Sequence, residues 1–117
     1  MKRIAYAALG LFAIALAIAV IVSQHAGWWQ FVVLAVAPDI ALLYGTSGDM
    51  ARGQLHPRAV PLYNAVHRLV VPAILIAVAI LLQANGWLAG GLAWIAHIAI
   101  DRSLGFGLRT AQGFQRT

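Results

Sequence analysis

The basic residues of this chain are confined to three stretches, and this distribution limits what the chain can fold into. The eight Lys and Arg residues lie at the N-terminus, in and just after one internal loop, and near the C-terminus: Lys2, Arg3, Arg52, Arg58, Arg68, Arg102, Arg109 and Arg116. Two pairs of apolar segments separate these stretches, and the turn within each pair carries no Lys or Arg. This is the positive-inside pattern of membrane proteins. We therefore predict an all-α bundle of four transmembrane helices with both ends in the cytoplasm.

The composition agrees with a membrane protein. Hydrophobic residues make up 62% of the chain and charged residues 9%, whereas a soluble domain carries about 25% charged residues. A net charge of +5 is also found in nucleic-acid-binding proteins, but here the basic residues flank apolar segments. We therefore expect contacts with the lipid bilayer and its anionic headgroups, and no nucleic-acid partner. The absence of cysteine excludes disulfides and thiolate chemistry.

We expect one domain over residues 1–117, in a bacterial inner membrane, with spans at about 4–22, 28–44, 60–82 and 87–104. The first apolar run, about 19 residues long, exceeds the roughly 7 to 15 of a signal peptide, which predicts a retained helix. Pro38 interrupts the second span, and Pro72 is expected to kink the third. Small residues recur every four positions at Ala13/Ala17, Ala15/Ala19 and Gly86/Gly90, a spacing that favours close helix packing.

The polar residues within the spans gather at one depth. Asp39, Asn64, His67, His97 and Asp101 lie within about 12 Å of the cytoplasmic ends of their spans, at about 1.5 Å rise per residue. Asn64 and His67 are three residues apart and His97 and Asp101 four, so each pair should share a helix face. An ionised carboxylate inside a span is costly unless paired. We therefore expect both aspartates to point toward histidine or arginine.

Three interpretations of this polar layer remain open. Asp39, His67, His97 and Asp101 could bind a divalent Zn, Mn or Fe ion, zinc being one example, and act as the catalytic residues of a hydrolase for a lipid or another membrane-delivered substrate. The same groups could perform acid–base chemistry without a metal, as in a proton-coupled transporter subunit. The layer could instead only fix helix packing in a structural subunit or homo-oligomer. The outer halves of the spans are almost free of polar residues, which weighs against a transport pathway.

Other polar residues have simpler interpretations. Asn64, Arg68 and Arg102 are candidate binding residues: either arginine could recognise a phosphate or carboxylate, or extend to the headgroups. Tyr63 and the tryptophans are expected mostly at the membrane interface. The remaining candidates are expected to be ordinary turn or loop residues, namely His25, Asp49 and His56.

The spacing of these residues resembles that of a known family. The motifs are Pro38-Asp39, Tyr63-Asn64-x-x-His67 and His97-Ile98-x-x-Asp101-Arg102-x-x-Gly105-Phe106-Gly107-Leu108-Arg109. Together they resemble a small bacterial membrane family known as a domain of unknown function (DUF4260). Phe106 stands where that family usually has tyrosine, and Arg109 where it usually has lysine. The resemblance implies a four-helix membrane fold with these polar residues as its hallmark, and it implies no assigned activity.

Overall fold

The computed structural model describes residues 2–45, 51 and 53–115, and its regular structure is helical. The elements are α1 (Lys2–Gln24), α2 (Trp28–Val36), the 3-10 turn η1 (Ala37–Asp39), α3 (Ile40–Tyr44), the 3-10 turn η2 (Pro57–Ala59), α4 (Val60–Val66), α5 (Val70–Leu81) and α6 (Asn85–Ser103). Over the described ranges there is no β-strand, only an isolated bridge between Arg109 and Gln115. The prediction of an all-α chain is confirmed.

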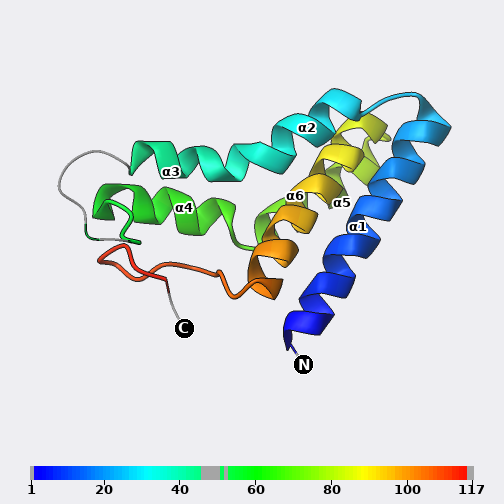
Figure 1. Ribbon diagram of the computed structural model, residues 1–117. Helices are drawn as coiled ribbons and strands as arrows, with labels where there is room; N and C mark the ends of the chain where they lie inside the picture. Colours follow the sequence, from blue (N-terminus) through cyan, green and yellow to red (C-terminus); the bar gives the residue numbers. More distant parts are fainter. Residues whose placement is uncertain (1, 46–50, 52, 116–117) are drawn as a thin grey trace.

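The central helix of the bundle is α6, and α1, α2 and α5 pack against it (Figure 1). Its buried residues are mostly small: Ala89, Gly90, Gly91, Leu92, Ala93, Ala96, Ile98 and Ala99. Small side chains let helix backbones approach closely. On α1, Ala13 and Ala17 are buried in one cluster with residues of α6, as their spacing predicts. Ala15 and Ala19 are exposed.

The glycine pair of α6 faces α2. A Cβ atom added to Gly86 would lie 2.5 Å from Nε2 of Gln30, and one added to Gly90 would lie 2.7 Å from Cδ1 of Leu34. Both distances are shorter than real carbon contacts allow. The GxxxG spacing therefore marks a helix contact, as predicted.

We expect Gly90→Val to lower the free energy of unfolding by about 1–3 kcal/mol, because the added methyl groups overpack the contact with α2. The matched control is Ala77→Val on α5, where the side chain is exposed and the change should stay within about 0.5 kcal/mol. Unfolding of the two variants in detergent measures the difference. Equal stability of the two variants would contradict this packing.

The α2, η1 and α3 segments follow one another without a gap, and η1 contains Pro38. Proline has no N–H to donate and so disrupts regular α-helical bonding. The chain continues here with the tighter 3-10 pattern, and the Pro38 side chain is fully buried. Beyond this turn, α3 lies beside α4 in an arm that extends away from α1 (Figure 1).

The predicted third span is divided into α4 and α5, which are bent by 40° at the break. Pro72 cannot donate to the carbonyl of Arg68, which accepts instead from the N–H of Val71 at 3.2 Å. The expected kink is thus a full interruption over residues 67–69.

Side chains of α6 stabilise this interruption. Trp94 Nε1 donates to the carbonyl of Val66 at 2.7 Å, and Arg102 Nη2 donates to the carbonyl of His67 at 3.4 Å. Carbonyls at a helix end lack intrahelical partners and need such donors. The break is therefore supported by tertiary contacts as well as by proline.

The segment after α6 packs against the α4 arm. Leu55 N–H donates to the carbonyl of Gly113 at 2.9 Å. Gly113 has φ 102°, and a Cβ there would collide with the carbonyl of Leu55. Glycine is the residue that adopts this conformation without strain. The tail is thus held to the loop before α4.

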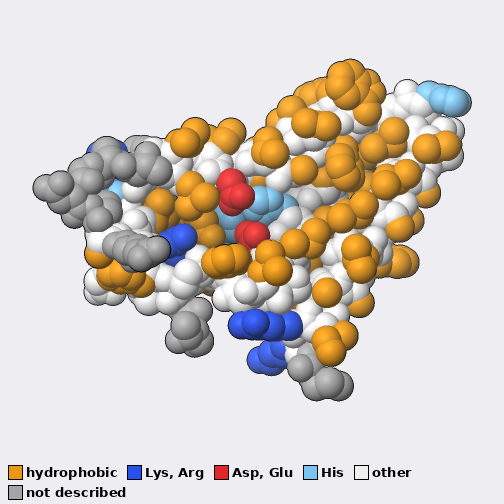
Figure 2. All heavy atoms as spheres, in the orientation of Figure 1, with side chains coloured by type: hydrophobic (Ala, Val, Ile, Leu, Met, Phe, Trp, Pro, Cys, Tyr) orange, Lys and Arg blue, Asp and Glu red, His pale blue; other side chains and the backbone are white. Residues whose placement is uncertain are grey.

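Much of the bundle surface is apolar, and Figure 2 shows hydrophobic side chains spread across the visible face. On α1 the large exposed hydrophobic residues extend along the helix: Ile4, Leu9, Leu11, Phe12, Leu16, Ile18 and Val22. Within the described residues, α1 is long and apolar enough to cross a membrane, and the bent α4–α5 pair would be a second span if it acts as one. This is limited support for a membrane protein, and the four-span topology stays a prediction.

Candidate metal centre

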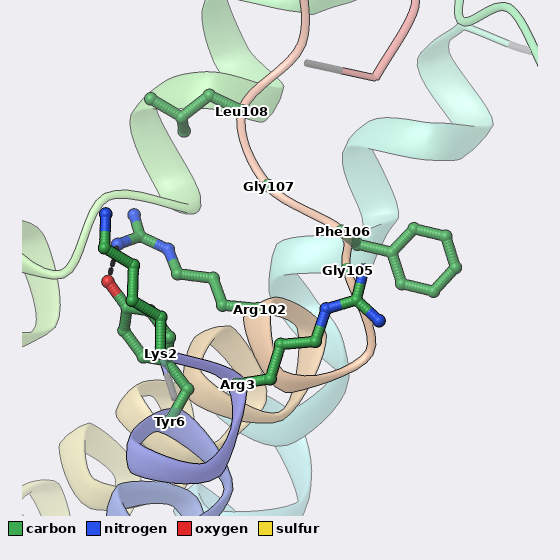
Figure 3. A pocket seen from close by; sticks show the side chains of 8 residues that line it. All are labelled: Lys2, Arg3, Tyr6, Arg102, Gly105, Phe106, Gly107 and Leu108. Atoms are coloured by element: carbon green, nitrogen blue, oxygen red, sulfur yellow. Dashed lines mark hydrogen bonds between the residues drawn. The ribbon is translucent and has the colours of Figure 1, made fainter. Parts of the chain in front are cut away.

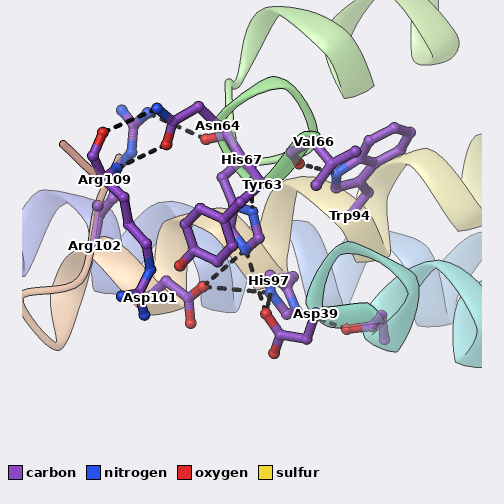
Figure 4. Close-up of polar contacts among 12 residues, drawn as sticks. Asp39, Tyr63, Asn64, Val66, His67, Trp94, His97, Asp101, Arg102 and Arg109 are labelled. Carbon is purple, nitrogen blue, oxygen red and sulfur yellow. Dashed lines mark hydrogen bonds and ion pairs between the residues drawn. The ribbon is translucent and has the colours of Figure 1, made fainter. Parts of the chain in front are cut away.

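Four of the candidate site residues come together where η1, the end of α4 and α6 meet (Figure 4). Asp39 ends η1, His67 follows the last residue of α4, and His97 and Asp101 lie one turn apart on α6. One ligand atom from each residue lies within 4.8 Å of all the others. Two of the three acidic residues of the whole chain are in this cluster. The third, Asp49, lies outside the described residues.

The nitrogen–oxygen distances in the cluster are short and similar. His97 Nε2 lies 3.1 Å from Asp39 Oδ1 and 3.3 Å from Asp101 Oδ2. His67 Nε2 lies 3.3 Å and 3.6 Å from the same two oxygens. Zinc bonds to histidine nitrogen and carboxylate oxygen are about 2.0–2.2 Å long, so the edges of a regular tetrahedron around zinc measure about 3.3–3.6 Å. Three of the four nitrogen–oxygen distances lie in that range, and the 3.1 Å distance lies just below it.

Each histidine is oriented by a backbone carbonyl. His67 Nδ1 lies 2.8 Å from the carbonyl oxygen of Tyr63, and His97 Nδ1 lies 2.7 Å from that of Ala35. A carbonyl accepts but cannot donate, so we assign a proton to each Nδ1 from its partner. Both Nε2 atoms therefore face the carboxylates. Metal-binding histidines are usually fixed in this way through their other ring nitrogen.

Two states satisfy these contacts. In one, both imidazoles are protonated, and each Nε2–H donates to Asp39 or Asp101. In the other, both imidazoles are neutral, so the Nε2 lone pairs and the carboxylate oxygens are all acceptors. Acceptors at these distances repel one another unless a cation lies between them. The arrangement can thus hold either two protons or one divalent metal ion.

The backbone irregularities of the fold create this geometry. The 3-10 turn that contains Pro38 changes the helical bonding pattern next to Ala35, whose carbonyl accepts from His97. The break before Pro72 places His67 at the C-terminal end of α4 with φ −105°. A continuous helix in either segment would point these groups elsewhere. Pro38 and Pro72 therefore shape the backbone around the site, although neither is a candidate ligand.

The cluster is buried on the histidine side and accessible on the carboxylate side. The His67 and His97 side chains are 3% and 10% exposed, against 25% for Asp101 and 46% for Asp39. Acidic and histidine side chains lie together on the visible face in Figure 2. A cavity of about 410 Å³ reaches Asp39, His97 and Asp101 between α1, α2 and α6. Small molecules can therefore reach the carboxylates.

The other three candidate residues lie outside the cluster. Asn64 pairs with the backbone of Arg109: its Oδ1 accepts from the N–H at 2.7 Å, and its Nδ2 donates to the carbonyl at 3.0 Å. Arg102 donates to the Tyr6 hydroxyl at 3.0 Å. Arg68 is exposed within the break between α4 and α5. Their role in ligand binding stays a prediction.

Two residues that were expected mostly at the membrane interface support the cluster instead. The Tyr63 side chain is buried rather than interfacial, with its ring stacked on His67 at 3.9 Å between centroids. Trp94 donates to the carbonyl of Val66 at the end of α4, just before His67. Its spacing of three and seven residues from His97 and Asp101 places it on their helix face, a signal that could have identified it.

The remaining histidines are separate from the site. His25 is exposed after α1, and His56 Nδ1 accepts from the N–H of Arg58 at 3.1 Å at the start of η2. Both therefore agree with the expected turn and loop roles.

Comparison with known proteins places the chain in a family. No curated protein and no solved structure matches it. Residues 5–117 match the family model described as a domain of unknown function, DUF4260. The matched range spans the positions of the motifs and of the four residues of the cluster. The match confirms the resemblance to this family. The chain therefore belongs to the DUF4260 family.

Proposed function

We propose that this protein is an integral membrane protein that binds one divalent transition metal ion, zinc by preference, through Asp39, His67, His97 and Asp101. The observation that carries the proposal is the pair of Nδ1-to-carbonyl contacts at 2.8 Å and 2.7 Å. They direct both Nε2 atoms toward the two carboxylates at tetrahedral spacing. A protonated network also satisfies the short distances, so metal binding has to be measured directly.

The ligand set favours zinc over the common alternatives. Calcium and magnesium prefer sites made of oxygen ligands, with six or more positions. Imidazole nitrogen suits zinc, copper, iron and nickel, and a four-coordinate tetrahedral arrangement is the one zinc adopts most often. Two imidazoles and two carboxylates would also leave the site neutral once a divalent ion is bound. That neutrality lowers the cost of burying the histidine side of the cluster.

Four spans with both ends in the cytoplasm, in a bacterial inner membrane, remain the proposed topology. The positive-inside distribution and the exposed hydrophobic residues of α1 support it. The 19-residue α6 is rich in alanine and glycine because it is the buried centre of the bundle. The run from α2 to α3 is divided by η1. Both features lower the mean hydropathy of the segment. They do not prevent a helix from crossing a bilayer where neighbouring helices surround it.

The proposed chemistry is hydrolysis of a membrane-delivered substrate. Zinc held by these residues would supply Lewis acidity and would activate water. Asp39 is the most exposed of the four side chains, and its carboxylate lines the 410 Å³ cavity. With four protein ligands, zinc would have to expand to five-coordination to take a water molecule. The Asp39 carboxylate oxygen that does not contact the histidines would then accept the proton of that water. His67, His97 and Asp101 hold the ion from the buried side.

The test is metal content and coordination geometry of the detergent-purified chain. We expect about one zinc per chain by elemental analysis, and the intense visible absorption of tetrahedral Co²⁺ after cobalt replacement. The variant His67→Ala/His97→Ala should lose both signals. The matched control, His25→Asn/His56→Asn, removes two histidines outside the cluster and should keep both. If the unmodified chain binds no metal at micromolar zinc, the metal site is wrong and the protonated network is favoured.

A further inference from the structure

A second cavity, of about 530 Å³, opens at the end of the bundle where α1 begins and α6 ends (Figure 3). Its polar wall comes from Lys2, Arg3 and Tyr6 of α1 and from Arg102 of α6. Residues 105–108, which include two glycines, close the other side. Nothing in the proposed metal chemistry uses this cavity. Its volume exceeds the 410 Å³ of the cavity beside the four-residue cluster.

Three cationic side chains line this cavity and no acidic one does. The two acidic residues that the structure describes, Asp39 and Asp101, make their ion-pair contacts with His67 and His97 and not with these cations. Like charges that line one cavity raise the energy of the folded state, and an anion bound among them lowers it. The cavity also receives the first turn of α1, whose N–H groups lack helical acceptors and favour negative charge.

Tyr6 holds Arg102 in place on this wall. Arg102 Nη1 donates to the Tyr6 hydroxyl at 3.0 Å, and its guanidinium carbon lies 5.4 Å from the ring centroid. Because the hydroxyl oxygen is the acceptor in that bond, its own hydrogen stays available for a ligand. Arg102 is also anchored to the carbonyl of His67. The arginine is thus fixed before any ligand arrives, which lowers the entropic cost of binding.

The glycine segment leaves room beside these cations. Gly105 has φ 95°, and a Cβ atom there would lie 2.5 Å from Nη2 of Arg3. A Cβ atom on Gly107 would meet no other atom within 4 Å. The first glycine therefore lets the Arg3 guanidinium lie against the backbone, and the second borders open space. A ligand group can approach the three cations from that side.

We propose that this cavity binds a phosphate group through Lys2, Arg3 and Arg102, with the Tyr6 hydroxyl as a further donor. Guanidinium groups match phosphate oxygens with two parallel hydrogen bonds, and lysine adds a compact positive charge. The phosphate belongs either to the headgroup of an anionic lipid or to a free phosphate ion. This site does not depend on the metal proposal, since none of its residues is a proposed metal ligand.

The test measures binding of three probes to the detergent-purified full chain by calorimetry: inorganic phosphate, dioctanoyl phosphatidic acid and dioctanoylglycerol, which lacks phosphate. EDTA is present so that phosphate on a metal ion does not contribute. We expect the two phosphate probes to bind and dioctanoylglycerol not to bind. Tighter binding of phosphatidic acid than of inorganic phosphate by about tenfold or more assigns the site to lipid headgroups; similar affinities assign it to free phosphate.

Two variants locate the binding. Lys2→Gln/Arg3→Gln should weaken the phosphate probes by about tenfold or more. The control Arg58→Gln removes a positive charge from an exposed residue outside the cavity and should change affinity less than about twofold. Tyr6→Phe leaves the charge unchanged and should weaken binding severalfold. The proposal is overturned if the unmodified chain binds neither phosphate probe. It is also overturned if Arg58→Gln weakens binding as much as Lys2→Gln/Arg3→Gln does.

Discussion

Asp101→Asn is expected to lower the zinc affinity by at least about 100-fold. Changes to residues that merely orient a metal ligand cost 10–100-fold, and this variant replaces a ligand itself. Asparagine keeps the shape of the side chain, so packing along α6 is preserved. It removes the negative charge that lies 3.3 Å from His97 Nε2 and 3.6 Å from His67 Nε2. Competition with a chromophoric chelator in detergent measures the affinity.

The matched control for that variant is Asp49→Asn. It removes the one acidic charge of the chain that is not among the four proposed ligands, and it tests whether a general loss of negative charge weakens cation binding. We expect less than a twofold change, because the sequence predicts Asp49 to be an ordinary loop charge. If both variants bind zinc like the unmodified chain, the carboxylates of the cluster are not ligands. If Asp101→Asn unfolds, circular dichroism detects it, and Asp101→Glu then tests the position with the charge retained.

Asn64→Ala is expected to lower the free energy of unfolding by about 2–4 kcal/mol. The side chain makes two hydrogen bonds to the backbone of Arg109, at 2.7 Å and 3.0 Å, and joins α4 to the C-terminal segment. Each bond contributes about 0.5–1.5 kcal/mol, and partners left unpaired cost about 1–3 kcal/mol more. Loss of the pair should also free the segment that carries Arg109. Denaturant unfolding gives the energy, and limited proteolysis reports release of the tail.

A suitable control is Asn85→Ala at the other end of the bundle. Its Nδ2 donates to Gln24 Oε1 at 3.1 Å in an exposed contact, so its loss should cost no more than about 0.5 kcal/mol. Faster proteolysis of the C-terminal segment in Asn64→Ala than in Asn85→Ala would agree with the structure. Equal stability and equal proteolysis of the two variants would mean that Asn64 does not hold the tail.

The sequence predicts helices well because hydrophobic segments and prolines act locally. The four apolar stretches correspond to α1, to the run from α2 to α3, to α4 with α5, and to α6. The GxxxG pair correctly marks a contact of α6. The break at residues 67–69 was expected only as a kink at Pro72. Its full extent depends on donors from Trp94 and Arg102, which no local pattern reveals.

In the candidate site, too, some features follow from local sequence and others from tertiary contacts. Helical spacing correctly places His97 and Asp101 one turn apart on α6. The same argument does not hold for Asn64 and His67, because the helix ends between them and the two side chains point to different partners. The distance of each residue from the end of its apolar segment predicted which residues come together better than the helix face did. That distance changes little when a helix breaks, whereas the face changes.

The sequence by itself determined the helical class, the family and the gathering of Asp39, His67, His97 and Asp101 near one end of their segments. These properties follow from composition, local spacing and motif, which act over a few residues. The tertiary structure decided which carbonyls orient the histidines, that Asn64 binds the tail, and that Arg102 joins Lys2 and Arg3 at one cavity. Those contacts join residues far apart in the chain, up to 96 positions for Arg102 and Tyr6. Packing around α6 brings them together, and no local periodicity specifies such pairs.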